Sequence, residues 1–298
     1  MPGERNRKTL VRMKEIRTSE RVAYVTGALL FLSGLAHAVV LIVSGGSWTG
    51  PLSMRKAVTF GLSFGLTLAT VAWATSYVAV RPRVRNVLLG VFTGASVVET
   101  VLVSMQAWRG VPSHFNFETG FDNAVSTTLA AGGGVLILTA VSFTAAAMRG
   151  EGEATASMRL AVRFGFVALL VALGAGAAMI ASGVVEARGG NPQVAYTTAG
   201  ALKPLHAVAM HAILIVPGLA WLLRFADWTE QRRVRLVWVA IGAYTVLTAV
   251  VGIESVTGVS PLAASPIEMV TSGLALGVLG VVGAVAAREV VRRRSRVR

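Results

Sequence analysis

Eight long apolar runs constrain the fold of this chain more than any other feature of its sequence. They lie near residues 22–44, 57–80, 86–108, 124–148, 160–185, 203–225, 234–256 and 262–287. Each is about 20 residues long, which matches a hydrocarbon core of roughly 30 Å at 1.5 Å per helical residue. Because backbone amides inside lipid must be hydrogen-bonded within the chain, each run is expected to be a helix. The sequence therefore predicts an all-α, polytopic membrane bundle of about eight spans.

The composition agrees with a lipid environment and narrows the chemistry. Apolar residues make up 54% of the chain and charged residues only 14%, against roughly 25% in soluble domains. The net charge of +14 lies in short segments between uncharged runs, so it forms no continuous basic face for a nucleic acid. The chain has no cysteine, so disulfides, thiolate metal sites and iron–sulfur clusters are excluded.

The distribution of Lys and Arg predicts the topology. Of the 28 basic residues, 23 fall in the tails and in alternate loops, all on one side of the predicted spans. The other side carries only Arg55, Lys56, Arg109, Arg188 and Lys203. Because positive loops stay in the cytoplasm, both termini are expected inside, in a bacterial inner (plasma) membrane. The basic rim is expected to bind anionic lipids.

The predicted organisation has five parts and a candidate internal repeat. The parts are a basic tail over 1–21, helices one to four over 22–148, a linker over 149–159, helices five to eight over 160–287 and a basic tail over 288–298. At an offset near 147 the halves show weak similarity, which pairs Lys56 with Lys203, Gln106 with Glu254 and Gly110 with Gly258. This pattern predicts two four-helix units of the same orientation. Chance alignment of Gly- and Val-rich segments is the alternative.

Small residues at close spacing mark expected helix contacts. Gly61 and Gly65, residues 132–134, and Gly273 and Gly277 each lie within one apolar run. Paired glycines let helix backbones approach each other in lipid. These positions therefore predict packing within a bundle and carry no information about activity.

Histidines and buried carboxylates are the candidate functional residues. All four histidines, His37, His114, His206 and His211, fall on the predicted outer side. Three carboxylates, Glu99, Glu254 and Glu268, lie inside or near the ends of spans. A carboxylate at bilayer depth costs several kcal/mol unless it faces a partner or water. The alternative for each is structural: a histidine bonded to a neighbouring carbonyl, or a glutamate near the interface that reaches water.

The predicted outer loop from Gln106 to Glu118, QAWRGVPSHFNFE, is too dense in polar and aromatic side chains for a simple linker. One interpretation is a cap over the bundle mouth that carries His114 inward while Arg109 binds an anionic group. The other is an aromatic belt at the headgroup level. The first interpretation is preferred.

Three segments resemble a family of bacterial multi-span membrane proteins. They are RKAVTFGLSFGL, QAWRGVPSHFN and LKPLHAVAMHAILIVPGLAWLL, and the resemblance extends from about residue 30 to 225. It implies that the outer loop and the two-histidine span belong to one family pattern. It implies no activity.

The preferred functional hypothesis is a metal- or haem-binding redox enzyme that acts near the outer face on a lipophilic or quinone-like substrate. Imidazoles with carboxylates suit Fe, Cu or Zn, and histidines from separate helices suit a haem b within a four-helix unit. The expected metal ligands are His37, His206, His211, Glu254 and Glu268. The residues expected to hold cofactor propionates are Arg55, Lys56 and Lys203, and the expected catalytic residues are Glu99, His114 and Arg109.

Two alternatives come from different functional classes. A proton-coupled secondary transporter or channel would use Glu99 as its protonation site, since repeats and mid-membrane acids are typical of such carriers. A structural membrane subunit would use the polar residues to contact a partner protein. All three hypotheses share the same predicted topology.

Overall fold

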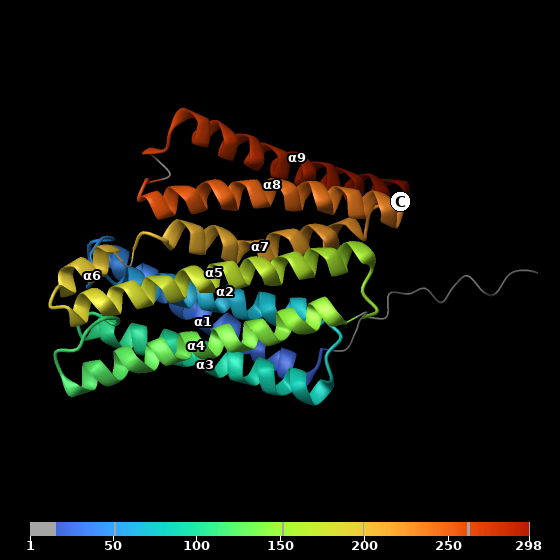
Figure 1. The fold of residues 1–298 in the computed structure, drawn as a ribbon. Coiled ribbons are helices and arrows are strands. Elements are labelled where there is room, and N and C mark those ends of the chain that lie inside the picture. The colour runs from blue at the N-terminus through green and yellow to red at the C-terminus, as the bar shows by residue number, and fades with distance from the viewer. Residues whose placement is uncertain (1–15, 51, 151, 199, 261–262, 298) are drawn as a thin grey trace, which may run out of the picture.

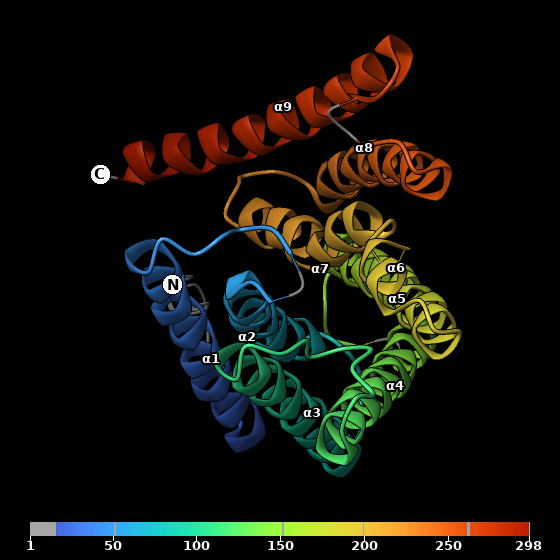
Figure 2. The same cartoon turned by 90° about the vertical axis from the view of Figure 1, so that its left-hand side faces the viewer.

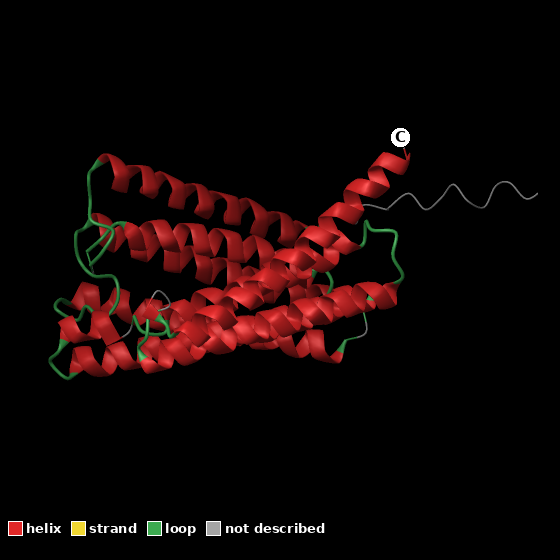
Figure 3. Cartoon of the chain, turned by 90° about the horizontal axis from the view of Figure 1, so that it is seen from above, coloured by secondary structure: helices red, strands yellow, loops and turns green. Residues whose placement is uncertain are grey.

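The computed structural model describes residues 16–50, 52–150, 152–198, 200–260 and 263–297, and all regular structure within these ranges is helical (Figures 1 and 3). The helices are α1 (Thr18–Val43), α2 (Arg55–Thr75), α3 (Pro82–Trp108), α4 (Gly120–Arg149), α5 (Ala156–Arg188), α6 (Pro192–Thr198), α7 (Lys203–Leu223), α8 (Glu230–Thr257) and α9 (Pro266–Val297). Eight helices, all except α6, are long and apolar enough to cross a membrane. The predicted polytopic helical bundle is therefore confirmed. Residues 1–15 of the predicted basic tail and the predicted start of the last span at 262 lie outside the described residues.

Local sequence sets most of the helix ends. Thr119, Thr155 and Thr229 precede α4, α5 and α8, and each side chain accepts a hydrogen bond from a backbone N–H in the first turn. This is the standard N-cap interaction for threonine. At the other end of α8, Gly258 adopts a left-handed conformation with φ of 74°, which glycine tolerates without steric cost.

The second span ends earlier than expected because a buried arginine caps α2. Helical structure was predicted as far as residue 80, but α2 ends at Thr75. The Arg85 guanidinium, from the first turn of α3, donates hydrogen bonds to the carbonyls of Thr75 and Val78. A cation here satisfies carbonyls that the helix itself leaves free. The short α6 was not predicted, because seven residues are too few for an apolar period to be recognised.

Two groups of four long helices share one packing plan. In the first unit, α1 to α4, the most extensive packing is between α1 and α2, then α2 packs on α3, α3 on α4, and α1 also contacts α3. In the second unit, α5 and α7 to α9, α5 packs most on α7, α7 on α8, α8 on α9, and α5 also contacts α8. The same order of contacts in both halves is what a duplication would produce.

Seen along the bundle axis, α2 and α7 occupy the centre, while α9 lies along the top edge and α1 at the left (Figure 2). The α2 and α7 helices begin 148 residues apart, at Arg55 and Lys203, and have the same length. A hydrogen bond from the Thr67 hydroxyl to the Met210 sulfur, 3.4 Å long, joins them. We call this contact the α2–α7 seam.

The two ends of the bundle are named by what they carry. The "α6 end" holds α6 and the connecting residues 44–50, 52–54, 109–119, 258–260 and 263–265 (Figure 1). The "tail end" holds the start of α1 and the C-terminal part of α9 (Figure 1). All residues predicted to lie on the outer side belong to the α6 end or to the half of the bundle near it.

Glycines bring α1 and α2 into backbone contact. A Cβ atom added to Gly61 would lie 2.6 Å from the Gly34 Cα, and one added to Gly65 would lie 2.6 Å from the Gly27 carbonyl oxygen. This confirms the predicted role of Gly61 and Gly65 in close helix packing. By contrast, a Cβ on Gly273 or Gly277 of α9 would meet no described atom within 4 Å.

Candidate functional site

A buried polar network closes the α6 end between α3 and α4. Asp122 accepts hydrogen bonds from the Gln106 amide at 2.8 Å, the Arg109 guanidinium at 2.6 Å and the Thr119 hydroxyl at 2.7 Å. Arg109 also donates to the Gln106 carbonyl oxygen. Arg109 was predicted to hold an anionic substrate group, but its charge is already paired with Asp122. The sequence analysis did not identify Asp122 as the partner because the two lie 13 residues apart across a loop.

The loop over residues 110–119 folds over this end of the bundle. Ser113, Phe115 and Asn116 are all buried. Phe115 has a positive φ of 61°, and its ring fills the space beside Gly183 of α5, where a Cβ atom would lie 2.3 Å from the ring. The buried residues favour the cap interpretation, while Trp108, which is 62% exposed, fits the aromatic belt.

His114 points into the bundle from this loop. Its ring lies 5.7 Å from the Phe60 ring of α2, and its Nδ1 is 2.9 Å from the Ser113 hydroxyl. Burial, together with the positive charge of Lys56, lowers the pKa of His114 to about 3. The imidazole is therefore neutral at physiological pH, so it can exchange hydrogen bonds but is a poor proton acceptor.

Both ring nitrogens of His37 are occupied. Nδ1 lies 2.7 Å from the Ser33 carbonyl oxygen, and Nε2 accepts a 3.0 Å hydrogen bond from the Trp108 indole N–H. The first contact requires the proton on Nδ1, which leaves Nε2 as the acceptor. A metal would have to displace Trp108 to bind here.

His206 and His211 lie on different faces of α7, as their five-residue spacing predicts. The Nδ1 of His206 bonds to the Ala172 carbonyl oxygen of α5 at 2.6 Å. The Nδ1 of His211 bonds to the Ala207 carbonyl oxygen of its own helix at 2.7 Å. Each imidazole is thus oriented by a backbone carbonyl, and the two do not share a site.

The predicted metal ligands do not converge. Within the ranges that the structure describes, no group of three or more His, Asp or Glu side chains is placed to hold a metal ion. His37, His206 and His211 each make the separate contacts given above. The predicted cofactor and its ligands therefore gain no support from these contacts and stay a prediction.

Glu99 lies at the interface of α3 and α4 with an unsatisfied oxygen. The residue is 4% exposed, and its Oε1 has no hydrogen-bond partner among the described atoms. A Cβ atom on Gly132 would lie 2.5 Å from that oxygen, so the glycine of α4 leaves the space that the carboxyl group fills. An unpartnered carboxylate is costly in a low-dielectric interior, which favours the protonated form.

The two other predicted acids differ from each other. Glu254 is 2% exposed near the α6 end of α8, and its Oε2 has no partner in the described part of the chain. Glu268 accepts a 2.8 Å hydrogen bond from the Ser265 backbone N–H and lies in the first turn of α9. Glu268 therefore acts as a helix cap, whereas Glu254 has no structural partner that explains its burial.

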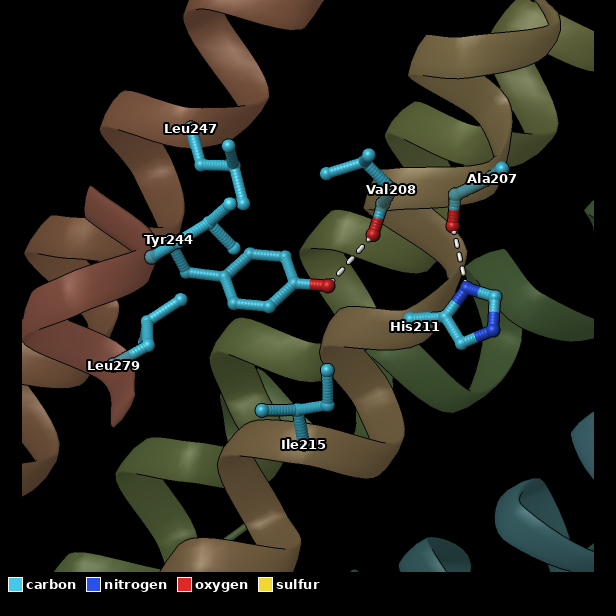
Figure 4. Close-up of a pocket in the computed structure, with 8 residues that line it drawn as sticks. Ala207, Val208, His211, Ile215, Tyr244, Leu247 and Leu279 are labelled. Atoms are coloured by element: carbon cyan, nitrogen blue, oxygen red, sulfur yellow. Dashed lines mark hydrogen bonds between the residues drawn. The ribbon is translucent and has the colours of Figure 1, made fainter. Parts of the chain in front are cut away.

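An apolar groove of about 340 Å³ runs between α7, α8 and α9. Figure 4 shows Val208, Ile215, Leu247 and Leu279 around it, with Tyr244 reaching across to donate a 2.8 Å hydrogen bond to the Val208 carbonyl oxygen. Its lining is apolar, so the groove suits an acyl chain. Tyr244 was not predicted as a feature of this site, because a lone tyrosine in an apolar run carries no distinguishing pattern.

A second, much smaller void of about 20 Å³ lies in the α2–α7 seam. Its lining includes the hydroxyl-bearing residues Ser63, Thr67 and Thr70 of α2, facing Met210 and His211 of α7. His211 also lines the larger groove, together with Tyr244 (Figure 4). The void has room for about one water molecule. Its surface is mainly apolar, and Ser63 and His211 at its edge are exposed on the outside of the bundle.

Comparison of the chain with protein-family models, with curated protein sequences and with solved structures finds no match. The resemblance drawn from the sequence segments therefore stays a prediction. The function must be argued from the residues themselves.

The sequence contains one common enzyme motif, and it lies in α2. Residues 61–65 read Gly-Leu-Ser-Phe-Gly, which fits the G-x-S-x-G pattern of serine hydrolases. The pattern requires a sharp turn between a strand and a helix, but Ser63 lies in the middle of α2, and both glycines contact α1. The motif is therefore a helix-packing feature and not a nucleophile elbow.

Proposed function

We propose that this protein is a proton-coupled secondary transporter of a bacterial plasma membrane, with the α6 end facing outward. In this proposal the two four-helix units, which also pack against each other through α4 and α5, move relative to each other along the α2–α7 seam. The observation that carries it is the seam itself: equivalent helices of the two units meet at the centre of the bundle (Figure 2). Carriers built from parallel repeats bind their substrate near the bilayer midplane, between the repeats.

The polar residues of the seam support a substrate path. Ser63, Thr67 and Thr70 fall on one face of α2, because they are four and three residues apart. His211 faces them from α7, and its Nδ1–H is held by Ala207, so its Nε2 is left as a hydrogen-bond acceptor. These groups would contact a substrate once the units separate.

Glu99 is the proposed proton site. Its unpartnered oxygen favours the protonated state in the present closed arrangement. Loss of the proton would place a charge between α3 and α4, and that charge would need water or a new partner. Protonation would therefore be coupled to the packing of α4 on α3 and, through α3, to the position of α2.

The lack of cysteine in the chain allows a direct test that needs no knowledge of the substrate. Single cysteines at Ser63 and Thr67 are introduced, the protein is reconstituted in liposomes, and labelling by a membrane-impermeant maleimide is measured from each side. We expect labelling of both positions, and we expect Glu99→Gln to shift it by at least fivefold toward one side. Val141→Cys, on an exposed apolar face of α4, is the control and should stay unlabelled.

Two results would contradict the proposal. One is that the seam cysteines react no faster than Val141→Cys from either side. The other is that Glu99→Gln leaves the side preference unchanged, which would remove Glu99 from the mechanism. A fluorescent pH reporter inside the liposomes then screens phosphate, sulfate and carboxylates for substrate-driven proton movement.

The metal hypothesis keeps its own test. Purified protein is examined by absorption spectroscopy and elemental analysis. A Soret band or a stoichiometric transition metal, lost on His206→Ala but retained on His37→Ala, would restore the redox hypothesis with a ligand set different from the predicted one.

A further inference from the structure

Three cations gather at the α6 end of the seam. Arg55 and Lys56 open α2, and Lys203 opens α7. Helix geometry explains why they meet. Lys56 lies 11 residues, about three turns, before Thr67, so the two share one face of α2. Lys203 lies seven residues, about two turns, before Met210, so these two share one face of α7. Because Thr67 and Met210 are in contact, both lysines fall on the faces where α2 and α7 meet.

The charges of this cluster are not neutralised within the described residues. Lys203 and Arg55 both act on Lys56 as repelling charges. None of the ion pairs that the structure forms includes any of the three. The Arg55 Nε is buried and has no hydrogen-bond partner. Like charges held close together without a counter-ion repel each other. A bound anion would therefore stabilise this arrangement.

The surroundings also favour an anion. The Lys56 ammonium lies 5.7 Å from the centre of the Tyr196 ring of α6, which holds the side chain beside the seam. The N-cap residues of α2 and α7, Met54 and Leu202, supply no side-chain hydrogen bond. The positive ends of both helix dipoles therefore add to the same field. Glu118 acts electrostatically on Tyr196, but none of the ion pairs among the described residues joins Glu118 to Lys56.

We infer that Arg55, Lys56 and Lys203 form a binding site for an anionic phosphate or carboxylate group at the α6 end of the seam. Arg supplies a planar fork for two anion oxygens, and Lys supplies a mobile point charge. The group can belong to a small free anion or to the headgroup of an anionic lipid. The inference concerns binding alone and does not depend on transport.

Binding is tested on the purified full chain with two probes. Inorganic phosphate and succinate are titrated in neutral detergent by calorimetry, and retention of phosphatidylglycerol from nanodiscs is measured by native mass spectrometry. We expect Lys56→Gln and Lys203→Gln each to weaken binding at least tenfold. Saturation by phosphate or succinate identifies a site for free anions, whereas retention of phosphatidylglycerol alone identifies a lipid site.

A matched control separates a site from general positive charge. Arg188 also lies near the α6 end, at the end of α5, where its guanidinium stacks 5.3 Å from the centre of the Phe117 ring. Arg188→Gln removes the same charge and should change the affinity by less than twofold. Folding of each variant is checked by its thermal unfolding midpoint, measured without anion. Lys56→Gln should not lower this midpoint, because it removes a charge that its neighbours repel. The inference is overturned if neither probe binds, or if Arg188→Gln weakens binding as much as Lys56→Gln does.

Discussion

The two four-helix units have polar residues at equivalent positions, but these residues differ in their hydrogen-bond partners. Gln106 and Glu254 each lie 24 residues after the start of their helices, α3 and α8, and both are buried. In the first unit Gln106 is bonded to Asp122 and Arg109. In the second unit Thr257 stands where Arg109 stands in the first, and the Glu254 carboxyl keeps an oxygen without a partner.

The helices of the first unit also pack more closely than α9 does in the second unit. Glycines hold α1 and α2 in backbone contact, whereas a Cβ added to a glycine of α9 would meet no described atom within 4 Å. An apolar groove lies beside α9. The comparison teaches that the first unit is a closed scaffold where α1 and α2 meet, and that its Gln106 side chain is hydrogen-bonded. The second unit packs less closely around α9, and its equivalent Glu254 carboxyl keeps an unpartnered oxygen. Buried polar atoms without a partner among the described residues occur in both units, at Glu99 and at Glu254.

The largest expected effect tests the closed scaffold directly. Gly61→Ala places a methyl group 2.6 Å from the Gly34 backbone, which only separation of α1 and α2 can relieve. We expect the free energy of unfolding to fall by about 3 kcal/mol or more, measured by reversible denaturation in mixed micelles. Gly277→Ala in α9 should stay within about 0.5 kcal/mol of the parent. Equal losses in the two variants would remove the contrast between the units.

The second prediction sharpens the contrast at Gln106 and Glu254. Gln106→Leu removes one hydrogen bond from Asp122 and one from Arg109, which stay paired with each other. We therefore expect a loss of about 1–3 kcal/mol in unfolding free energy. Glu254→Leu removes a carboxyl that already lacks a partner and should be neutral or stabilising. The measurement is the same denaturation experiment. A large loss for Glu254→Leu would show that this acid has a structural role after all.

A smaller effect is expected at Gly132. The methyl group of Gly132→Ala would displace the Glu99 carboxyl, which is the flexible end of a side chain. We expect a cost of about 1 kcal/mol, relieved in the double variant with Glu99→Ala. A double-mutant cycle measures the coupling. If the two changes are additive, the carboxyl does not occupy the space beside Gly132.

The last prediction concerns the pH dependence contributed by His114. Its pKa in the folded protein is about 3, below the usual value of 6.5. The folded state thus binds fewer protons between these two values. Its contribution to stability is complete above pH 6.5 and is lost as the pH falls toward 3. Thermal midpoints between pH 7 and 4 should fall less steeply for His114→Gln than for the parent, and identical slopes would contradict the assigned burial.

The sequence predicts the spans well because lipid imposes one requirement on every residue in a run, as in α5 or α8. It predicts the site poorly because side-chain direction depends on neighbours. His37 and His211 both bond to the carbonyl four residues earlier in their own helices, a local choice that spacing does not reveal. Pairs across a seam, such as Thr67 with Met210, are 143 residues apart and need the helix packing to be known.

The arginine cap between α2 and α3 has a mechanical consequence. Arg85 belongs to α3 and donates hydrogen bonds to carbonyls at the end of α2. Separation of α2 from α3 at this turn would break these hydrogen bonds to a buried cation. Movement of α2 would therefore carry α3 with it. The two helices are expected to move as one rigid body, fixed to each other at the tail end.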